Sequence, residues 1–173
     1  YELYCKMLEE AVDKARGIEE IPEAEETAFN LPIPAILSER YIENEMLRLQ
    51  MYKKIAMITS DEDESEIIDE LLDRFGDIPK ATMNLIKISK IRAMAGKLGI
   101  SEISQQGYKI IFKLLENVKL TERIMAGLIS TYGGRMMING GREPYIRLTI
   151  GKDDPLQAIE KFLQIAVGER KPN

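Results

Sequence analysis

The sequence predicts an α+β fold: a helical N-terminal half followed by a layered β-β-α-β-β-α unit with a mainly antiparallel sheet. Apolar side chains recur at helical spacing through most of residues 1–99, and from Ile100 the repeat shortens to the two-residue period of strands. Glycine and proline at segment ends, as in Gly76 with Pro79, supply the stop signals between elements. A chain of 173 residues forms one domain or two small ones.

Three helices are expected in the N-terminal half after residue 42. The first covers about 43–58, the second about 62–75 after a cap at Ser60 or Asp61, and the third about 80–98. The segment before them contains two prolines and should be extended along a sheet edge over residues 29–41. The side chains predicted to be buried are Leu47, Met51, Ile55 and Ile58 in the first helix and Ile67, Ile68, Leu71, Leu72 and Phe75 in the second.

The second half alternates hairpins with helices. Over residues 108–114, apolar side chains alternate with Lys109, Ile111 and Lys113, the pattern of a half-buried strand. Residues 100–104 should pair with this strand, and the helices should cover one face of the resulting sheet. The remaining expected elements are a helix over about 121–132, strands over 135–139 and 145–150, and a helix over about 155–168.

The first residues are expected to be separate from the rest. Residues 2–16 have the spacing of an amphipathic helix, and Gly17 follows where such a helix would end. Residues 18–27 are rich in glutamate and contain a proline, which is typical of a solvated linker. The first helix therefore looks like the tail of an upstream element.

Composition excludes several classes of protein. The chain is 45% apolar and 31% charged, as is typical of globular proteins, and it lacks an apolar run of the ~18–20 residues that a membrane helix needs. It contains no histidine, which excludes Ser-His-Asp and Cys-His catalysis and histidine-ligated metals. The single cysteine, Cys5, cannot form an internal disulfide and fits a reducing compartment such as the cytoplasm.

Catalytic and metal-binding motifs are also absent from the sequence. Neither phosphate-binding loop, GxxxxGK[ST] or GxGxxG, occurs. Residues 61–72 begin like a calcium loop, but Glu66 and Leu72 stand where that loop needs glycine and glutamate. We therefore expect no enzymatic activity, no cofactor and no metal site in this chain.

Charge is distributed unevenly. Residues 1–99 hold 13 basic and 21 acidic residues, whereas residues 100–173 hold 11 and 8. An acidic half repels phosphate backbones and suits a basic protein partner. Within it, Glu70 and Asp73 lie three residues apart on one helical face, near the negative end of the helix dipole. Arginines of a partner can bind such carboxylates bidentately, although a solvated acidic face is the plainer interpretation.

A second candidate surface lies on the predicted sheet. On the face away from the apolar residues, Lys109 and Lys113 are expected to join Tyr145 and Arg147. Such a face can contact phosphates or stack a base. The alternative is the ordinary solvent side of an antiparallel sheet, and the sequence leaves both interpretations open.

Residues 70–79, ELLDRFGDIP, resemble the ELxDRFGxxP signature of the C-terminal domain of bacterial transcription-repair coupling factors. Leucine at position 72 stands where many relatives have isoleucine, a change that should not affect a surface contact. The resemblance covers residues 1–105 well, and the rest matches only in its strand–helix pattern. The other matching segments are Glu2-Leu-Tyr4, residues 7–12 (MLEEAV), Leu31-Pro32, Tyr41-Ile42, Arg48-Leu49, residues 52–56 (YKKIA), Ala95 and residues 97–100 (KLGI).

This resemblance implies a regulatory protein–protein contact. The full-length family protein is an ATP-driven translocase on double-stranded DNA that displaces stalled RNA polymerase and recruits the repair protein UvrA. Its terminal domain packs against an N-terminal module similar to UvrB and covers the UvrA-binding surface. The two acids of the signature face that module, so Glu70 and Asp73 are expected to make this autoinhibitory contact.

The resemblance also implies how the chain is divided. Residues 1–17 would be the closing helix of the upstream motor, residues 18–27 an acidic linker, and residues 28–173 the regulatory domain. ATP and magnesium would bind to the motor outside this chain, RNA polymerase and DNA would be contacted by upstream domains, and no membrane partner is expected.

Two rival hypotheses remain open. One is a nucleic-acid-binding module that uses Lys109, Lys113 and Arg147. The other is an enzyme that acts through acidic residues, which no motif supports.

Overall fold

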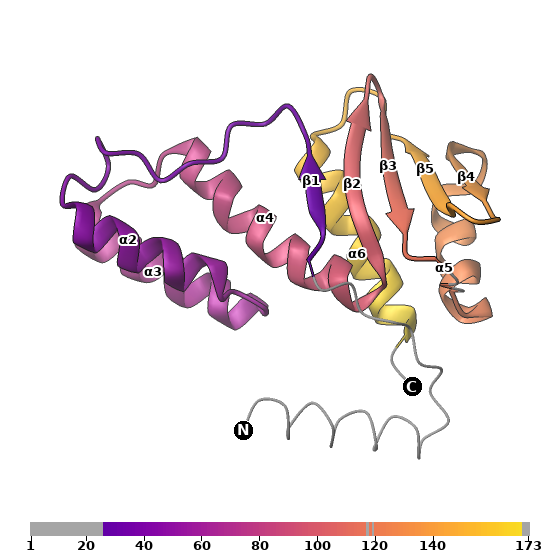
Figure 1. The fold of residues 1–173 in the computed structure, drawn as a ribbon, viewed down its shortest axis with the longest axis horizontal. Helices are drawn as coiled ribbons and strands as arrows, with labels where there is room; N and C mark the ends of the chain where they lie inside the picture. Colours follow the sequence, from indigo (N-terminus) through magenta and orange to yellow (C-terminus); the bar gives the residue numbers. More distant parts are fainter. Residues whose placement is uncertain (1–25, 117, 119, 171–173) are drawn as a thin grey trace, which may run out of the picture.

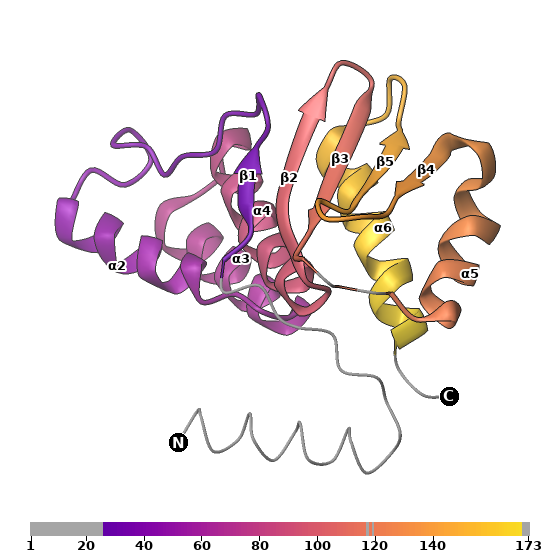
Figure 2. The same ribbon diagram turned by 45° about the vertical axis from the view of Figure 1, so that its right-hand side comes forward.

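Two blocks of structure share one long helix. The computed structural model describes residues 26–116, 118 and 120–170. Within them, a five-stranded sheet is covered on one face by helices, and two further helices lie beside it (Figures 1 and 2). The predicted α+β fold class is confirmed. The predicted helix at 2–16 and nearly all of the predicted linker lie outside the described residues, so the boundaries at residues 17 and 27 stay predictions.

The helical block has its own hydrophobic core. Helices α2 and α3 pack against the first half of α4, and the segment before α2 adds Leu37 and Ile42. The helix bounds are Glu45–Ala56 for α2, Asp61–Phe75 for α3 and Lys80–Lys97 for α4. The buried apolar residues of this core are Leu37, Ile42, Met51, Ile55, Ile58, Ile67, Leu71 and Ile86.

Local signals set both ends of α3. Ser60 Oγ accepts the backbone N–H of Asp63, as expected of a helix N-cap, and acidic residues fill the positively charged first turn. Gly76 ends the helix with φ +86°, a conformation that L side chains rarely adopt. The prediction that Leu72 is buried is wrong, since it is 46% exposed. Helix α3 packs along one side only, and Leu72 lies about 100° round the helix from buried Leu71.

The sheet has the strand order β1-β2-β3-β5-β4 and is antiparallel except where β1 pairs with β2. Both predicted hairpins are present, and the first is longer than expected because β2 continues to Gln106. Tyr108 therefore falls in the turn and is 64% exposed, which corrects its predicted place on the apolar side of the strand. The strand bounds are Ala28–Asn30 for β1, Ile100–Gln106 for β2, Lys109–Leu114 for β3, Met136–Asn139 for β4 and Tyr145–Thr149 for β5.

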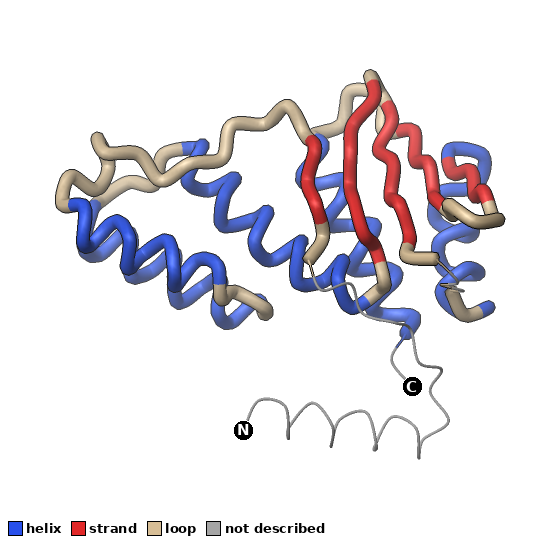
Figure 3. Tube along the Cα trace, viewed as in Figure 1, coloured by secondary structure: helices blue, strands red, loops and turns tan. Residues whose placement is uncertain are grey.

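Helices cover one face of the sheet. Helix α4, helix α5 (Glu122–Tyr132) and helix α6 (Pro155–Arg170) lie behind the strands (Figures 1 and 3). Side chains alternate along β3, so Ile110 and Phe112 are buried beneath these helices. Phe112 stacks on Phe162 of α6 with ring centroids 4.1 Å apart. Within the part of the chain that the structure describes, no helix covers the opposite face, which is named the open face below.

A buried ion-pair network joins the two blocks. The side chain of Lys90 in α4 is 4% exposed, and its Nζ lies 2.9 Å from Asp61 Oδ1 and 3.1 Å from Glu64 Oε1, both in α3. The same Nζ lies 2.9 Å from Glu160 Oε1 in α6. Lys87, one turn earlier, adds ion pairs to Glu64 and Glu160. Burial works against the charge of Lys90, but hydrogen bonds from it to the three carboxylates prevail and raise its pKa above the ordinary value.

Replacing Lys90 by methionine should destabilise the chain strongly. Methionine keeps most of the volume but removes the more deeply buried of the two cations that Glu64 and Glu160 share, and removing one partner of a buried ion pair costs about 3–5 kcal/mol. We expect about 3 kcal/mol, at the low end of that range, because Lys87 stays within reach of both carboxylates. Urea unfolding measures this loss. The matched control is Lys161→Met at an exposed position of α6, which should change the free energy of unfolding by less than about 0.5 kcal/mol. An equally small effect of Lys90→Met would contradict the role assigned to Lys90.

Acid should weaken the fold through two of its carboxylates. A hydrogen bond from Lys90, with the charge of that lysine, holds the pKa of Asp61 below its ordinary value of 3.8. Hydrogen bonds from Lys54 and Arg74 lower the pKa of Glu70 in the same way. Because both groups are more acidic in the folded chain, their stabilisation is complete above the unfolded pKa and is lost as pH falls through the folded values.

We therefore expect the urea midpoint to fall moderately below about pH 4, because water screens both carboxylates. The fall should be shallower in Asp61→Asn, which has no carboxylate to protonate at that position. Acid titrations that superimpose for the two proteins would show that Asp61 does not contribute.

Candidate functional site

The solvent side of α3 carries a row of carboxylates. Glu62, Glu66, Asp69 and Asp73 are all exposed, and they follow one another at intervals of four, three and four residues. This spacing aligns side chains along one side of a helix. Among the described residues, none of the four has a hydrogen-bond or ion-pair partner for its side chain. We call these four residues the acidic stripe. Like charges so placed repel one another weakly, and a basic partner would relieve that repulsion.

The two acids of the predicted pair have different surroundings. Glu70 turns toward α2, where its Oε1 accepts a hydrogen bond from Lys54 Nζ at 3.0 Å. Its Oε2 accepts another from Arg74 Nη1 at 2.7 Å. Asp73 is exposed and belongs to the acidic stripe. The charge of Glu70 is thus already balanced within the chain, whereas Asp73 presents a free carboxylate to solvent.

Exposed apolar side chains lie near these acids. Leu72, the neighbour of Asp73, is 46% exposed, and Met57 at the end of α2 is 73% exposed. Met57 lines a shallow groove between α2 and α3 together with Glu66 and Glu70. Exposed methionine and leucine among charged residues are typical of protein–protein contact surfaces.

Part of this surface is visible in the sequence and part is not. The positions of Glu62, Glu66, Asp69 and Asp73 are those of one helical face, so a search by spacing would have found the stripe. The ion pair between Lys54 and Glu70 depends on how α2 packs against α3, which no local pattern encodes.

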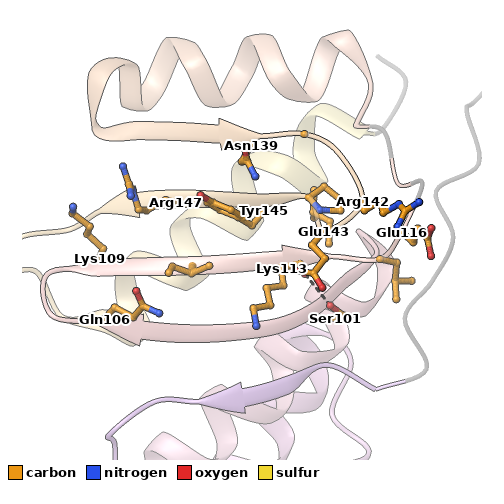
Figure 4. A pocket seen from close by; sticks show the side chains of 15 residues that line it. Ser101, Gln106, Lys109, Lys113, Glu116, Asn139, Arg142, Glu143, Tyr145 and Arg147 are labelled. Atoms are coloured by element: carbon orange, nitrogen blue, oxygen red, sulfur yellow. Dashed lines mark hydrogen bonds between the residues drawn. The ribbon is translucent and has the colours of Figure 1, made fainter.

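The open face of the sheet is the second candidate site (Figure 4). The register of β3 with β5 places Lys113 opposite Tyr145 and Ile111 opposite Arg147. Lys109 lies at the end of the same row, opposite Thr149. The structure thus brings together on one face the four side chains that the sequence analysis singled out, Lys109, Lys113, Tyr145 and Arg147.

Contacts within the open face divide its cations into two kinds. Lys113 Nζ lies 3.2 Å from Glu102 Oε2 of β2, so its charge is balanced. Arg147 Nη2 contacts the sulfur of Met137 at 3.2 Å, which leaves the guanidinium charge unbalanced. Lys109 is exposed and has no partner among the described residues. A hollow on this face continues from these side chains to Arg142 and Glu143 in the β4–β5 turn.

The described residues offer neither a metal site nor a membrane-spanning helix. Among the described residues, aspartate and glutamate side chains form no group of three that could hold a metal ion. None of the helices in the described ranges has the length and apolar character needed to cross a membrane.

Relatives of this chain carry the name that the signature suggested. A "Transcription-repair-coupling factor" of Staphylococcus haemolyticus (strain JCSC1435) is 34% identical over 167 residues, which are 94% of this chain and 14% of that protein. The protein of the same name from Staphylococcus epidermidis (strain ATCC 12228 / FDA PCI 1200) is 36% identical over 173 residues, covering 98% of this chain and 15% of the relative. This chain therefore spans about a seventh of the length of these relatives.

A solved structure and a family model complete the comparison. The structure described as "Crystal structure of C-terminal domain of transcription-repair coupling factor" has a TM-score of 0.70 at 19% identity, over 84% of this chain and 94% of that one. At this identity the match shows the shared fold. The family model "TRCF domain" matches residues 31–124, which are more than half of the chain. The chain belongs to the TRCF domain family of transcription-repair coupling factors.

Proposed function

We propose that this chain is the regulatory domain of a longer coupling factor and acts by protein–protein contact without catalysis. Its partner would be the UvrB-like N-terminal module of the same protein, and the contact would cover the surface that binds UvrA. The observation that carries the proposal is the free, exposed carboxylate of Asp73 at the end of the acidic stripe, beside exposed Leu72.

The charge arrangement on α3 supports a basic partner. An arginine can bind the Asp73 carboxylate with two parallel hydrogen bonds, and Leu72 would add apolar contact area beside it. Glu70 would contribute less, because a partner cation has to compete with Lys54 and Arg74 for its oxygens. We therefore assign direct recognition to Asp73, and a smaller part to Glu70.

A tethered partner makes a weak contact sufficient. Within one polypeptide the effective concentration of the partner module is on the order of millimolar for a short flexible linker. The covered and uncovered states then form an equilibrium that UvrA, or movement of the motor, can shift. The translocase activity on double-stranded DNA at stalled RNA polymerase, with its ATP and magnesium, would belong to other parts of this cytoplasmic protein.

Charge reversal at Asp73 tests the proposal in the full-length coupling factor that contains this chain. Asp73→Lys should repel the basic partner surface and raise the affinity for UvrA about tenfold, a typical size for the coupling of two binding sites. Glu70→Gln should raise it less. Surface plasmon resonance with immobilised UvrA at low salt measures both changes.

The matched control is Asp153→Lys, which makes the same charge change at an exposed turn before α6, in the sheet block. It should leave UvrA affinity unchanged. Either an unaltered affinity in Asp73→Lys or an equal rise in Asp153→Lys would count against a contact through α3.

A further inference from the structure

The open face is positively charged on a chain whose net charge is −5. Within its strands it holds three cations and a single acid, Glu102, and that acid is already paired with Lys113. The unbalanced positive charge therefore comes from Lys109 and Arg147. Figure 4 shows these two side chains next to each other at one end of the face, where their charges add. This pair repels other cations and attracts a polyanion.

An aromatic side chain lies beside this cationic pair. Tyr145 is half-buried, precedes Arg147 by two residues on β5 and shares its face of the sheet. Asn139 lies opposite Tyr145 on β4, and its exposed amide can both donate and accept hydrogen bonds. The face therefore offers, in order, a cationic pair that can bind phosphates, the ring of Tyr145 that can stack on a base, and the amide of Asn139 that can bind a base edge (Figure 4).

We propose that the open face binds single-stranded nucleic acid, with Lys109 and Arg147 on phosphates and Tyr145 stacked on a base. The shape of the face favours a single strand over a duplex. A duplex is read by an element that enters its groove, whereas an open sheet face with an aromatic residue accepts bases that are splayed out. The Glu-containing turn, with Glu143 beside Arg142, bounds the site at the other end of the face.

An acidic protein segment fits this face less well. A docked helix needs an apolar groove for its buried side chains. Among the cations of the open face, the apolar side chains are Ile111 and the ring of Tyr145, both half-buried, and the exposed Met137 beside Arg147. The site is also separate from the acidic stripe, which lies on α3 in the other block, so its occupation does not depend on the regulatory contact proposed above.

Salt dependence gives a quantitative test with the 173-residue chain itself. The probe is a fluorescein-labelled oligothymidylate of about 12 nucleotides, followed by fluorescence anisotropy in KCl. Two phosphate contacts should give a slope of log affinity against log salt of about −1.4, or a loss of about sevenfold between about 50 and 200 mM. Lys109→Ala should halve that slope. The control Lys161→Ala removes the same charge from α6 on the helix side and should not change it.

Variants at Tyr145 separate stacking from structure. Tyr145→Phe keeps the ring and should keep the affinity, while Tyr145→Leu keeps bulk without the ring and should lose about fivefold or more. Urea unfolding verifies that both variants are folded. Four results would each overturn the proposal: no binding at the lowest salt, tighter binding of a duplex of the same length, equal binding of a polyglutamate peptide, or equal affinity of the Phe and Leu variants.

Discussion

The arrangement of the two blocks depends on the charge of one buried lysine. Lys90 is nearly inaccessible, and its ammonium group is the point at which α3, α4 and α6 meet. Charge buried without partners is very costly, so the three carboxylates have to remain close to it and the helices that carry them have to stay in place. The two hydrophobic cores do not fix that relation on their own, because they are separate and α4 is the element that contributes to both. The ion pairs add the directional restraint that apolar packing between the blocks lacks.

Because the blocks are held in this way, the two candidate surfaces have fixed and separate places. The acidic stripe runs along α3 in the helical block, and the cationic pair of Lys109 and Arg147 lies on the open face of the sheet block. A single net charge of −5 describes neither of them. Screening in physiological salt acts over about 8 Å, so a partner responds to the charges within reach of its own surface rather than to the total. One small domain can therefore present an anionic surface and a cationic surface to partners of opposite charge.

Elements with strong local signals were predictable from the sequence, and contacts between elements were not. Local sequence correctly predicted the start of α3 at the capping residue Ser60, the end of α3 at Gly76 and the alternating burial along β3. Leu72 was misassigned because helical spacing predicts a broad apolar stripe, whereas α3 is covered on one side only. Tyr108 was misassigned because the end of a hairpin is set by where pairing stops, and β2 pairs two residues further than its apolar pattern suggests. Helical spacing and the family resemblance both singled out Glu70 and Asp73, but only the packing of α2 against α3 shows that Glu70 has partners and Asp73 has none among the described residues.

That difference changes what the signature means physically. Two carboxylates three residues apart suggest a single acidic patch. The charge of one of them, Glu70, is however already balanced by Lys54 and Arg74. Exposed ion pairs of this kind contribute little to stability, typically below about 1 kcal/mol, so their removal leaves the fold largely intact. They nevertheless compete with any incoming cation for the same oxygens. Asp73 has no internal cation in the described part of the chain, so a partner cation can bind its carboxylate without displacing another group. The strength of a contact on α3 is therefore set less by how many acids the helix displays than by how many of them the chain has left unpaired.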